Sequence, residues 1–319
     1  MRSSVSLVVA ALAVCCVSMA GAVRAEDYPA KTIFIVVGPG PDTVARLIAQ
    51  KMSEDWKQQV LVDPQPASGG VAAAHAVAKA APDGYTMLLT TGSYSINEAL
   101  RPQLPFKLMH DFDPVVEVAS LPFVVMVPSS LPVKTLADLV KLASSKPGEI
   151  NCASSGVGTT AHLGCALFNR VAKVKTVHVP YKGLAPAIVD LISGRVQITF
   201  SVPTTLGYVK SGQLRALAVT GSKRLSALPD VPTVAEAGFP DLAFTSWNGL
   251  HVPAGTPKAI IAKLNAEIGK IRDEPDIHQR LITLGFTPEG GTPEQFGEYV
   301  KADITRWEKV VKETGVKVE

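Results

Sequence analysis

The sequence predicts an α/β fold of two domains, with mostly parallel sheets, helices on both faces of the sheets and two hinge crossings between the domains. Three observations lead to this prediction. Strand and helix patterns alternate along most of the chain, two extended apolar runs have no helical period, and the C-terminal part contains two amphipathic helix patterns. Such an alternation is typical of βαβ units, and it occurs in both halves of the chain.

Short apolar runs that predict strands are followed by segments with the apolar period of a helix. In the first of these helices Asp42 is the expected N-cap, and Val44, Leu47, Ile48 and Met52 form the inward face. The predicted strands cover 32–37, 60–62, 86–90, 150–153, 176–179, 196–200 and 214–219. The other helices cover 70–80, 186–192 and a segment that begins at Thr159.

The two extended apolar runs, 121–128 and 246–253, both end in proline and are interpreted as crossings between the domains. A chain that crosses twice has both of its ends in one domain. The prediction is therefore a first domain of 26–128 plus 246–319 and an inserted second domain of 129–245.

The C-terminal tail holds two helical apolar stripes, which we expect to pack against the first domain and to carry no chemistry. Thr292 precedes Pro293 and is the expected cap of the second helix. The stripes are formed by Ile260, Ile261, Leu264, Ile268 and Ile271, and by Phe296, Tyr299, Val300, Ile304, Trp307, Val310 and Val311.

The N-terminus has the pattern of a cleaved signal peptide covering 1–25. Arg2 precedes an apolar run over 5–20, and Val23-Arg24-Ala25 fits a cleavage site. Without Arg2 and Arg24 the chain has 29 basic and 28 acidic residues, which gives no indication of nucleic-acid binding. These features predict an exported, periplasmic protein.

Export leaves Cys152 and Cys165 in an oxidising compartment. One lies on a predicted strand and the other in the helix that follows. A disulfide and two buried free thiols are both compatible with this spacing.

The segment from 150 to 168 is the most informative part of the sequence. A short strand leads into a loop of Ser, Gly and Thr, which opens directly into an amphipathic helix. Backbone amides at a helix N-terminus have no partner within the helix and attract anions. The loop residues Ser155, Gly156, Gly158, Thr159 and Thr160 therefore predict a site for an anion such as a carboxylate.

In open α/β sheets a ligand lies beyond the carboxyl ends of the strands. The corresponding loops are expected to face one another across a cleft between the domains, which is the geometry of a binding protein that closes at a hinge. They cover 38–43, 66–70, 90–97, 154–160, 181–184 and 201–205.

Catalytic and cofactor sites fit the sequence less well. The run from Gly156 to Ala161 matches a dinucleotide fingerprint, but the following strand ends at Tyr181-Lys182 without the acidic residue that would bind a ribose. No Gly-x-Ser-x-Gly elbow is present, and no acidic residue lies near His162 in the sequence. The histidines and cysteines show no metal-ligand spacing. We therefore expect no cofactor, no metal and no enzymatic activity.

The chain resembles the Bug (Bordetella uptake gene) family, the periplasmic substrate-binding components of tripartite tricarboxylate transporters. The resemblance extends over essentially all of 28–319. It depends on the 154–163 loop and on the motifs Tyr28-Pro29-Ala30-Lys31, Ala80 to Thr86, His178 to Gly183, Leu214 to Thr220, Leu228 to Thr233 and Pro253 to Pro257. It implies a two-domain fold of the type II periplasmic-binding-protein class, known as a Venus flytrap. It also implies a monomer that binds a small organic carboxylate and delivers it to a membrane permease.

The resemblance also assigns the binding residues. By the family pattern the carboxylate site falls on the loop that ends at Asp42-Thr43 and includes Gly40, and on 155–160. The rest of the site is expected to be lined by Ser93, Asn97, Tyr181, Ser201 and Thr204.

Two positions depart from the family pattern. The loop at 38–42 is about three residues shorter than usual, which alters one wall of the pocket. Ser201-Val202 stands where the family often has Asp-Asn; the loss of that carboxylate either reduces repulsion of a second acid group on the ligand or leaves room for a less polar ligand. An alternative function is a ligand-sensing partner of a membrane receptor or sensor kinase, and the sequence does not separate it from transport.

Overall fold

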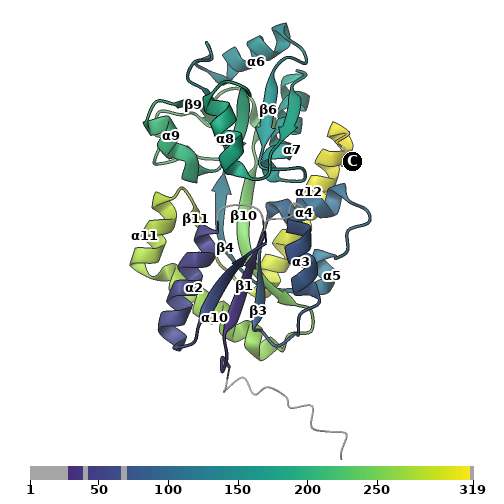
Figure 1. Cartoon of the computed structure of the whole chain (residues 1–319), viewed down its shortest axis with the longest axis vertical. Helices are drawn as coiled ribbons and strands as arrows, with labels where there is room; N and C mark the ends of the chain where they lie inside the picture. The colour runs from purple at the N-terminus through teal and green to yellow at the C-terminus, as the bar shows by residue number, and fades with distance from the viewer. Residues whose placement is uncertain (1–27, 39–41, 66–69, 317–319) are drawn as a thin grey trace, which may run out of the picture.

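The computed structural model describes residues 28–38, 42–65 and 70–316. The predicted signal peptide and Gly40 lie outside the described residues. Two sheets lie one above the other in Figure 1, each with helices on both faces. The first sheet has the strand order β11-β4-β10-β3-β1-β2, and the second has the order β7-β6-β8-β5-β9.

For the elements that the sequence predicted, the observed bounds agree closely with the expected ranges; most of β4, and β11, α4, α5, α6, α9 and α11, were not predicted, and α4 begins in a segment that was expected to be a loop. The first sheet contains β1 (Ile33–Val37), β2 (Val60–Pro64), β3 (Thr86–Thr91), β4 (Phe112–Pro122), β10 (Thr245–Pro253) and β11 (Thr287–Pro288), with α2 (Thr43–Trp56), α3 (Val71–Ala78), α4 (Gly92–Leu100), α5 (Leu108–Asp111), α10 (Lys258–Asp273), α11 (Pro275–Thr283) and α12 (Pro293–Thr314). The second contains β5 (Val124–Pro128), β6 (Asn151–Ser154), β7 (Val177–Pro180), β8 (Ile198–Ser201) and β9 (Leu214–Val219), with α6 (Leu136–Ser145), α7 (Thr160–Ala172), α8 (Leu184–Ile192), the 3₁₀ turn η3 (Pro203–Thr205) and α9 (Leu206–Lys210).

Helices cover both faces of each sheet because the strands alternate buried side chains between two cores. On β1, Ile35 packs into the core that holds α2 and α10, whereas Val36 packs into the core that holds α3 and part of α12. On β5, Val125 faces the core of α6 and α7, and Val124 faces the core of α8. This period of two is the pattern expected for a strand that is buried on both sides.

The sheets are mixed, so the expectation of mostly parallel sheets is wrong in this detail. β1 pairs in parallel with β2 and β3, and β6 pairs in parallel with β7 and β8. β10 is antiparallel to β3 and β4, and β5 is antiparallel to β8 and β9. The reason is that β5 and β10 each follow a passage of the chain between the sheets, so each enters its sheet from the side at which the neighbouring strands β8 and β3 end, and runs in the opposite direction.

The chain passes between the sheets at two points. β4 belongs to the first sheet and β5 to the second, so the first passage occurs at Phe123. The second passage occurs before β10, which starts at Thr245 and lies wholly in the first sheet. The pairing thus assigns 124–128 to the second sheet, and the exact domain boundaries stay a prediction.

The sequence led us to expect that the C-terminal helix α12 packs against the first sheet only. This expectation is wrong, because α12 also packs into the core of the second sheet. Phe296 and Val300 lie in the first-sheet core, but Trp307 is buried in the core of α6 and α7, with Val310 and Val311 at its edge. A helix of 22 residues is about 33 Å long and extends beyond one domain core. Figure 1 shows α12 rising from the first sheet to the side of α7. For α10, the expected packing against the first sheet is confirmed.

The two predicted caps differ in outcome. Thr292 accepts a hydrogen bond from the amide of Gln295 and forms a capping box, as expected. Asp42 precedes α2 but makes no side-chain cap. Its carboxylate instead accepts a hydrogen bond from Nε of Arg46 at 2.9 Å. A full positive charge one turn away competes successfully with the backbone amides for this carboxylate.

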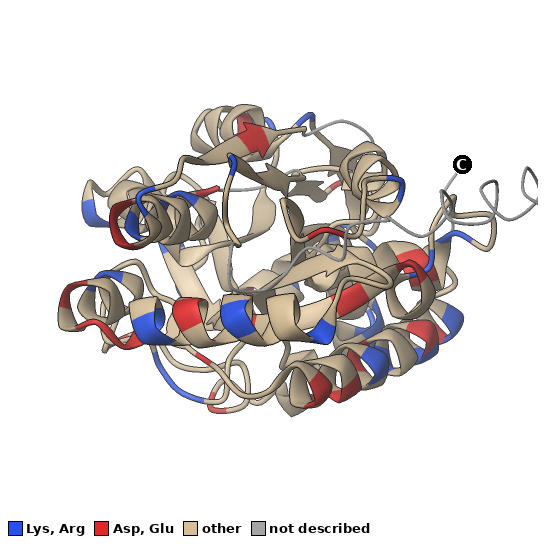
Figure 2. Cartoon of the chain, turned by 90° about the horizontal axis from the view of Figure 1, so that it is seen from below, with Lys and Arg blue, Asp and Glu red and all other residues tan. Residues whose placement is uncertain are grey.

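Charged residues of both signs are interspersed on the outer helices of the face seen in Figure 2. This mixture matches the near balance of acidic and basic residues in the sequence. Within the part of the chain that the structure describes, no helix has the length and apolarity needed to cross a membrane.

A disulfide joins Cys152 on β6 to Cys165 on α7, with 6.0 Å between the Cα atoms. Of the two alternatives that the sequence left open, the structure therefore contains the bridge. The bridge closes the loop that connects β6 to α7, which is the segment that the sequence marks as the anion site.

We expect that replacing both cysteines, Cys152→Ala together with Cys165→Ala, lowers the free energy of unfolding by about 3 kcal/mol. The reason is that a crosslink that closes a loop of roughly this length reduces the conformational entropy of the unfolded chain, and the variant loses this effect. Chemical denaturation of the chain from residue 26 onward measures the loss. In that protein the unfolded, unreduced chain should expose no free thiol. Two thiols that react without a reductant would contradict the bridge.

Candidate functional site

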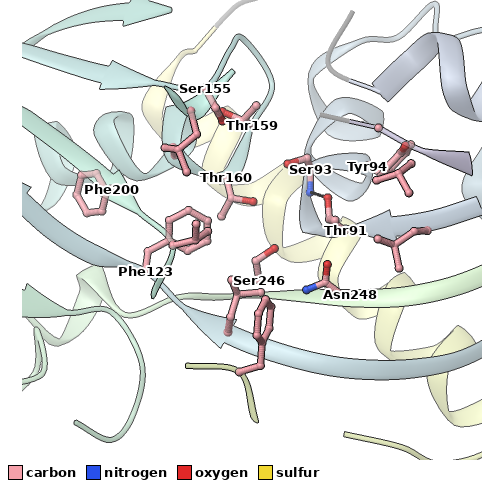
Figure 3. A pocket seen from close by; sticks show the side chains of 18 residues that line it. Thr91, Ser93, Tyr94, Phe123, Ser155, Thr159, Thr160, Phe200, Ser246 and Asn248 are labelled. Carbon is pink, nitrogen blue, oxygen red and sulfur yellow. Dashed lines mark hydrogen bonds between the residues drawn. The ribbon is translucent and has the colours of Figure 1, made fainter. Parts of the chain in front are cut away.

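A cavity lies between the two sheets, where strands from both sheets end. Residues at the ends of β1 and β3 or directly after them meet those that follow β6 and β8 across it, among them Gly38, Thr91, Ser155 and Val202. Figure 3 shows side chains from both sheets around this space. The position agrees with the rule that α/β sheets bind ligands beyond the carboxyl ends of their strands.

Two helices begin at this cavity, one from each sheet. α4 starts at Gly92 directly after β3, and α7 starts at Thr160 after the loop that follows β6. Ser93 of α4 lines the cavity, as do Thr160 and Ala161 of α7. The first amides of a helix lack acceptors within the helix, and the positive end of the helix dipole lies there. The cavity therefore has two sources of positive potential that are not charged side chains.

Gly92 keeps the space between these helix ends open. A Cβ atom at this position would lie 2.9 Å from Oγ of Ser246 and 3.6 Å from Oγ1 of Thr160. The hydroxyls of β10 and α7 thus converge on the first residue of α4. A side chain larger than hydrogen at position 92 would enter this polar end of the cavity.

The hydroxyls around the cavity fall into two groups. Some cap the helices: Thr91 accepts a hydrogen bond from the amide of Ser93, and Thr159 accepts one from the amide of His162. The others form no side-chain hydrogen bond within the described residues and are therefore available to a ligand or to water. This second group comprises the hydroxyls of Ser93, Ser155, Thr160 and Ser246, together with the side-chain amide of Asn248.

Tyr94 supplies a further polar group. Its ring lines the cavity and is almost fully buried, and its hydroxyl finds no hydrogen-bond partner among the described residues. Burial raises the pKa of this phenol, so the group remains a neutral donor. A buried hydroxyl without a partner loses free energy, which a bound ligand or water would restore.

Apolar side chains form the opposite wall. Figure 3 shows Phe123 and Phe200 on one side of the cavity, with Thr91, Ser93 and Asn248 on the other. Both phenylalanine rings pack on Phe244, with centroids 5.5 and 5.8 Å from it. The wall is therefore held by the core of the second sheet.

The structure brings four of the predicted site residues together at the cavity: Ser93, Ser155, Thr159 and Thr160. The remaining described ones do not line it. Ser201 is buried with its hydroxyl 2.9 Å from that of Thr205, and the hydroxyl of Tyr181 donates to Asp190 at 2.7 Å. The other predicted residues outside the lining are Asp42, Thr43, Asn97, Gly156, Gly158 and Thr204.

Asn97 and Gly158 nevertheless shape the site. The side-chain amide of Asn97, on α4, donates to the carbonyls of Ser93 at 2.8 Å and Gly158 at 3.2 Å. A Cβ on Gly158 would lie 2.5 Å from Oδ1 of Asn97, and the φ of Gly158 is +79°, where glycine is favoured. This contact ties the N-terminal turn of α4 to the loop before α7.

The sequence prediction missed the residues of β10. Ser246 and Asn248 lie two positions apart, so both point to the same face of the strand. That alternation was visible in the sequence, but the segment was interpreted as a crossing only. Gly92 and Tyr94 were within a predicted loop and were not singled out.

Comparison with known proteins identifies the family. Residues 44–316 match the family model described as the tripartite tricarboxylate transporter family receptor. The chain belongs to this family. It is similar to a UPF0065 protein from the tcbD–tcbE intergenic region of Pseudomonas sp. strain P51, with 39% identity over 91% of this chain and 88% of the relative. It is also similar to BugT of Bordetella pertussis, with 35% identity over 94% of both chains.

Solved structures show the same two-domain fold. Rpa4515 of R. palustris, solved with adipate, has 35% identity and a TM-score of 0.87 over 91% of this chain and 99% of its own. MatC of Rhodopseudomonas palustris, solved with bound malate, has 33% identity and a TM-score of 0.84 over 89% and 100%. The periplasmic binding protein BugD has 28% identity and a TM-score of 0.86 over 92% and 100%. The chain is thus a solute-binding receptor of the two-domain periplasmic-binding-protein class.

In this receptor two histidines support the loop on which the sequence predicts the anion site. The rings of His162 and His178 stack with their centroids 3.9 Å apart. Nδ1 of His162 accepts a hydrogen bond from the amide of Gly158 at 3.2 Å, and Nε2 of His178 lies 2.7 Å from Oγ of Ser154. Burial lowers the pKa of His162 to about 4. Burial and the neighbouring His162 lower the pKa of His178 to about 3.

The Ser154–His178 pair has the composition of a catalytic dyad but not its position. Ser154 is fully buried and does not line the cavity, and its hydroxyl donates to the carbonyl of Gly156 at 3.0 Å. Within the described residues no cluster of histidine, cysteine, aspartate or glutamate could hold a metal ion. The pair holds the loop in shape.

The histidines predict a pH dependence of stability. In an unfolded chain both imidazoles titrate near pH ~6.5, whereas the folded values are about 4 and about 3. As the pH falls below about 6.5 the unfolded chain binds protons that the folded chain does not, so the free energy of unfolding decreases, by at most about 1.4 kcal/mol per pH unit for each histidine. Urea denaturation at pH 7.0, 6.0 and 5.0 measures this slope.

The matched control is a variant with His162→Asn and His178→Gln, which retains an acceptor near the position of Nδ1 of His162 and a donor near the position of Nε2 of His178 but has no imidazole. Buried His251, whose pKa is lowered to about 3, is present in both proteins and cancels in the comparison. The variant should lose less stability between pH 7.0 and 5.0 than the original protein. Equal slopes would show that the histidine pair is not responsible.

Proposed function

We propose that this receptor is exported to the periplasm, binds a small organic carboxylate in the cavity between its domains, and delivers it to the permease of a tripartite tricarboxylate-type transporter. The observation that supports this most directly is the meeting of two helix N-termini and several unpaired hydroxyls at one cavity. In this proposal the protein acts as a monomer and performs no chemical reaction. The adipate and malate of two solved relatives support a carboxylate as the ligand class.

The physical basis of binding is charge-assisted hydrogen bonding. A carboxylate oxygen placed between Gly92 and Thr160 would lie at the first turns of two helices and within reach of the hydroxyls of Thr160 and Ser246, which form no side-chain hydrogen bond among the described residues. A hydrogen bond to a charged group contributes about 1.5–3 kcal/mol, and a helix dipole adds about 0.3–1 kcal/mol.

Gly92→Ala is expected to weaken carboxylate binding at least tenfold, because the added methyl group meets Oγ of Ser246 in the polar end of the cavity. Isothermal titration calorimetry with adipate, malate, hexanoate and benzoate provides the measurement. In the original protein at least one of these acids should bind, and it should raise the melting temperature.

Gly269→Ala on α10 is the matched control, because a Cβ at that position would meet nothing within 4 Å. It should bind as tightly as the original protein. Ser246→Ala removes a hydroxyl without adding volume and should also weaken binding. If Gly92→Ala and Ser246→Ala both folded and bound the acids normally, the carboxylate would not lie at this end of the cavity.

A further inference from the structure

A buried carboxylate lies on α12, close to the point where this helix passes from one core to the other. Asp303 is only 5% exposed, with Ile304 beside it in the first-sheet core and Trp307 one turn further along in the core of the second sheet. The same helix packs along α4, whose first turn reaches the cavity. A buried acid is costly unless it is paired or hydrogen-bonded, so the partners of Asp303 indicate what it holds in place.

Donors from three elements lie around this carboxylate. Nε1 of Trp247, on β10, donates a hydrogen bond to Oδ2 of Asp303 at 2.8 Å. Burial raises the pKa of Asp303, whereas the nearby side chains of Trp247, Ser95 on α4 and Trp307 on α12 oppose this effect. The hydroxyl of Ser95 and Nε1 of Trp307 are buried and form no hydrogen bond among the described residues. The bond from Trp247 is therefore the contact that fixes the carboxylate geometrically.

Trp247 connects this acid to the binding cavity. A Cβ atom on Gly92 would lie 3.6 Å from Nε1 of Trp247, so the bonded N–H lies beside the first residue of α4. Ser246 and Asn248, on either side of Trp247 in β10, both line the cavity. The indole itself is fully buried and does not line it. The bond to Asp303 thus fixes a ring that lies directly behind the place where α4 and β10 meet.

Removal of the acceptor would disturb this arrangement. A buried N–H without an acceptor loses its hydrogen bond and still bears the cost of leaving water. A movement of the indole toward another acceptor would relieve that cost. Because Gly92 lies against the same N–H, such a movement would change the position of the first turn of α4 relative to β10.

We propose that Asp303 is a positioning residue for ligand binding, and that it acts through Trp247 to hold the first turn of α4 against β10. The inference rests on the proposed function, because it assumes that the ligand carboxylate binds where Gly92, Thr160 and Ser246 converge. In this proposal Asp303 never contacts the ligand, and its acceptor oxygen matters more than its charge.

Three substitutions separate the hydrogen bond from the charge. Asp303→Asn keeps an acceptor oxygen for Trp247 without the charge, Asp303→Leu has neither, and Trp247→Phe removes the donor. Titration calorimetry uses whichever of adipate, malate, hexanoate and benzoate binds the original protein most tightly. Asp303→Leu and Trp247→Phe should each weaken binding about tenfold, which corresponds to the loss of roughly one hydrogen bond, and Asp303→Asn should bind nearly as tightly as the original protein. Combining Asp303→Leu with Trp247→Phe should weaken binding no further, because both substitutions remove the same contact.

Ile268→Ala on α10 is the matched control for a general loss of stability. Ile268 is fully buried in the core that holds α2 and α10, which includes neither Trp247 nor Asp303, so its truncation destabilises the protein without touching the bond. This variant should bind the acid normally. Equal loss of affinity in Ile268→Ala and Asp303→Leu would overturn the inference, as would normal binding by folded Asp303→Leu. Equally weak binding by Asp303→Asn and Asp303→Leu would assign the effect to charge and overturn it too. Trp247→Phe tests the same contact if Asp303→Leu does not fold.

Nuclear magnetic resonance of the indole N–H groups observes the bond itself. The chain has three tryptophans, and the signal of Trp247 is the one that Trp247→Phe lacks. Asp303→Leu should shift this signal in the absence of any acid, because the N–H loses its acceptor. Saturating acid should shift it in the original protein, while the signal of Trp56, whose ring packs on Tyr28, stays in place.

A Trp247 signal that stayed in place in either experiment, while the acid still bound, would overturn the inference and leave the proposed function intact. If none of the four acids bound the original protein, the proposed carboxylate function would fail, and the positioning role of Asp303 would fail with it.

Discussion

The site depends on one constraint: the first turns of two helices from different sheets must face the same small space. Each helix contributes amides that have no partner within the helix, and only a residue without a side chain at position 92 lets the two ends approach. The hydroxyls of Thr160 and Ser246 are then brought to the same point. Several contacts elsewhere in the molecule support this approach of the two helix ends.

Three kinds of contact keep the first turns of α4 and α7 close together. The disulfide fixes β6 to α7, so the loop between them has fixed ends. Asn97 joins α4 to the carbonyl of Gly158 across the gap between the two helices, and the stacked histidines hold the loop from the other side. Finally, α12 packs its two ends into the cores of different sheets, with Trp307 in the second. Each of these contacts acts on the relative placement of α4 and α7.

Much of this architecture could be predicted from the sequence. The strands and helices that were predicted follow their apolar period, and the Ser/Gly/Thr loop marked one of the two helix ends because it follows a strand and precedes an amphipathic run. The other helix end, the start of α4, lies in a segment that was expected to be a loop. Strand direction could not be predicted, because a buried strand has the same apolar sequence pattern whether its neighbour is parallel or antiparallel. The contribution of β10 was also missed, since Ser246 and Asn248 reach the cavity only when the strand inserts between β3 and β4. Residues such as Tyr181 and Ser201 lie at the expected strand ends, but bonds to Asp190 and Thr205 occupy their hydroxyls.

A site that binds its ligand through amide and hydroxyl dipoles differs from a charged site in how the ligand is released. A buried pair of an arginine and a carboxylate would hold its ligand by full charges, and breaking it would leave an uncompensated ion. Amides and hydroxyls bind an anion well only while water is excluded, because water offers the same hydrogen bonds. Under the proposed function, separating the two helix ends would therefore be sufficient to weaken binding, and no proton or counterion would have to move. The neutral lining thus suits a receptor that must capture its ligand tightly and then transfer it.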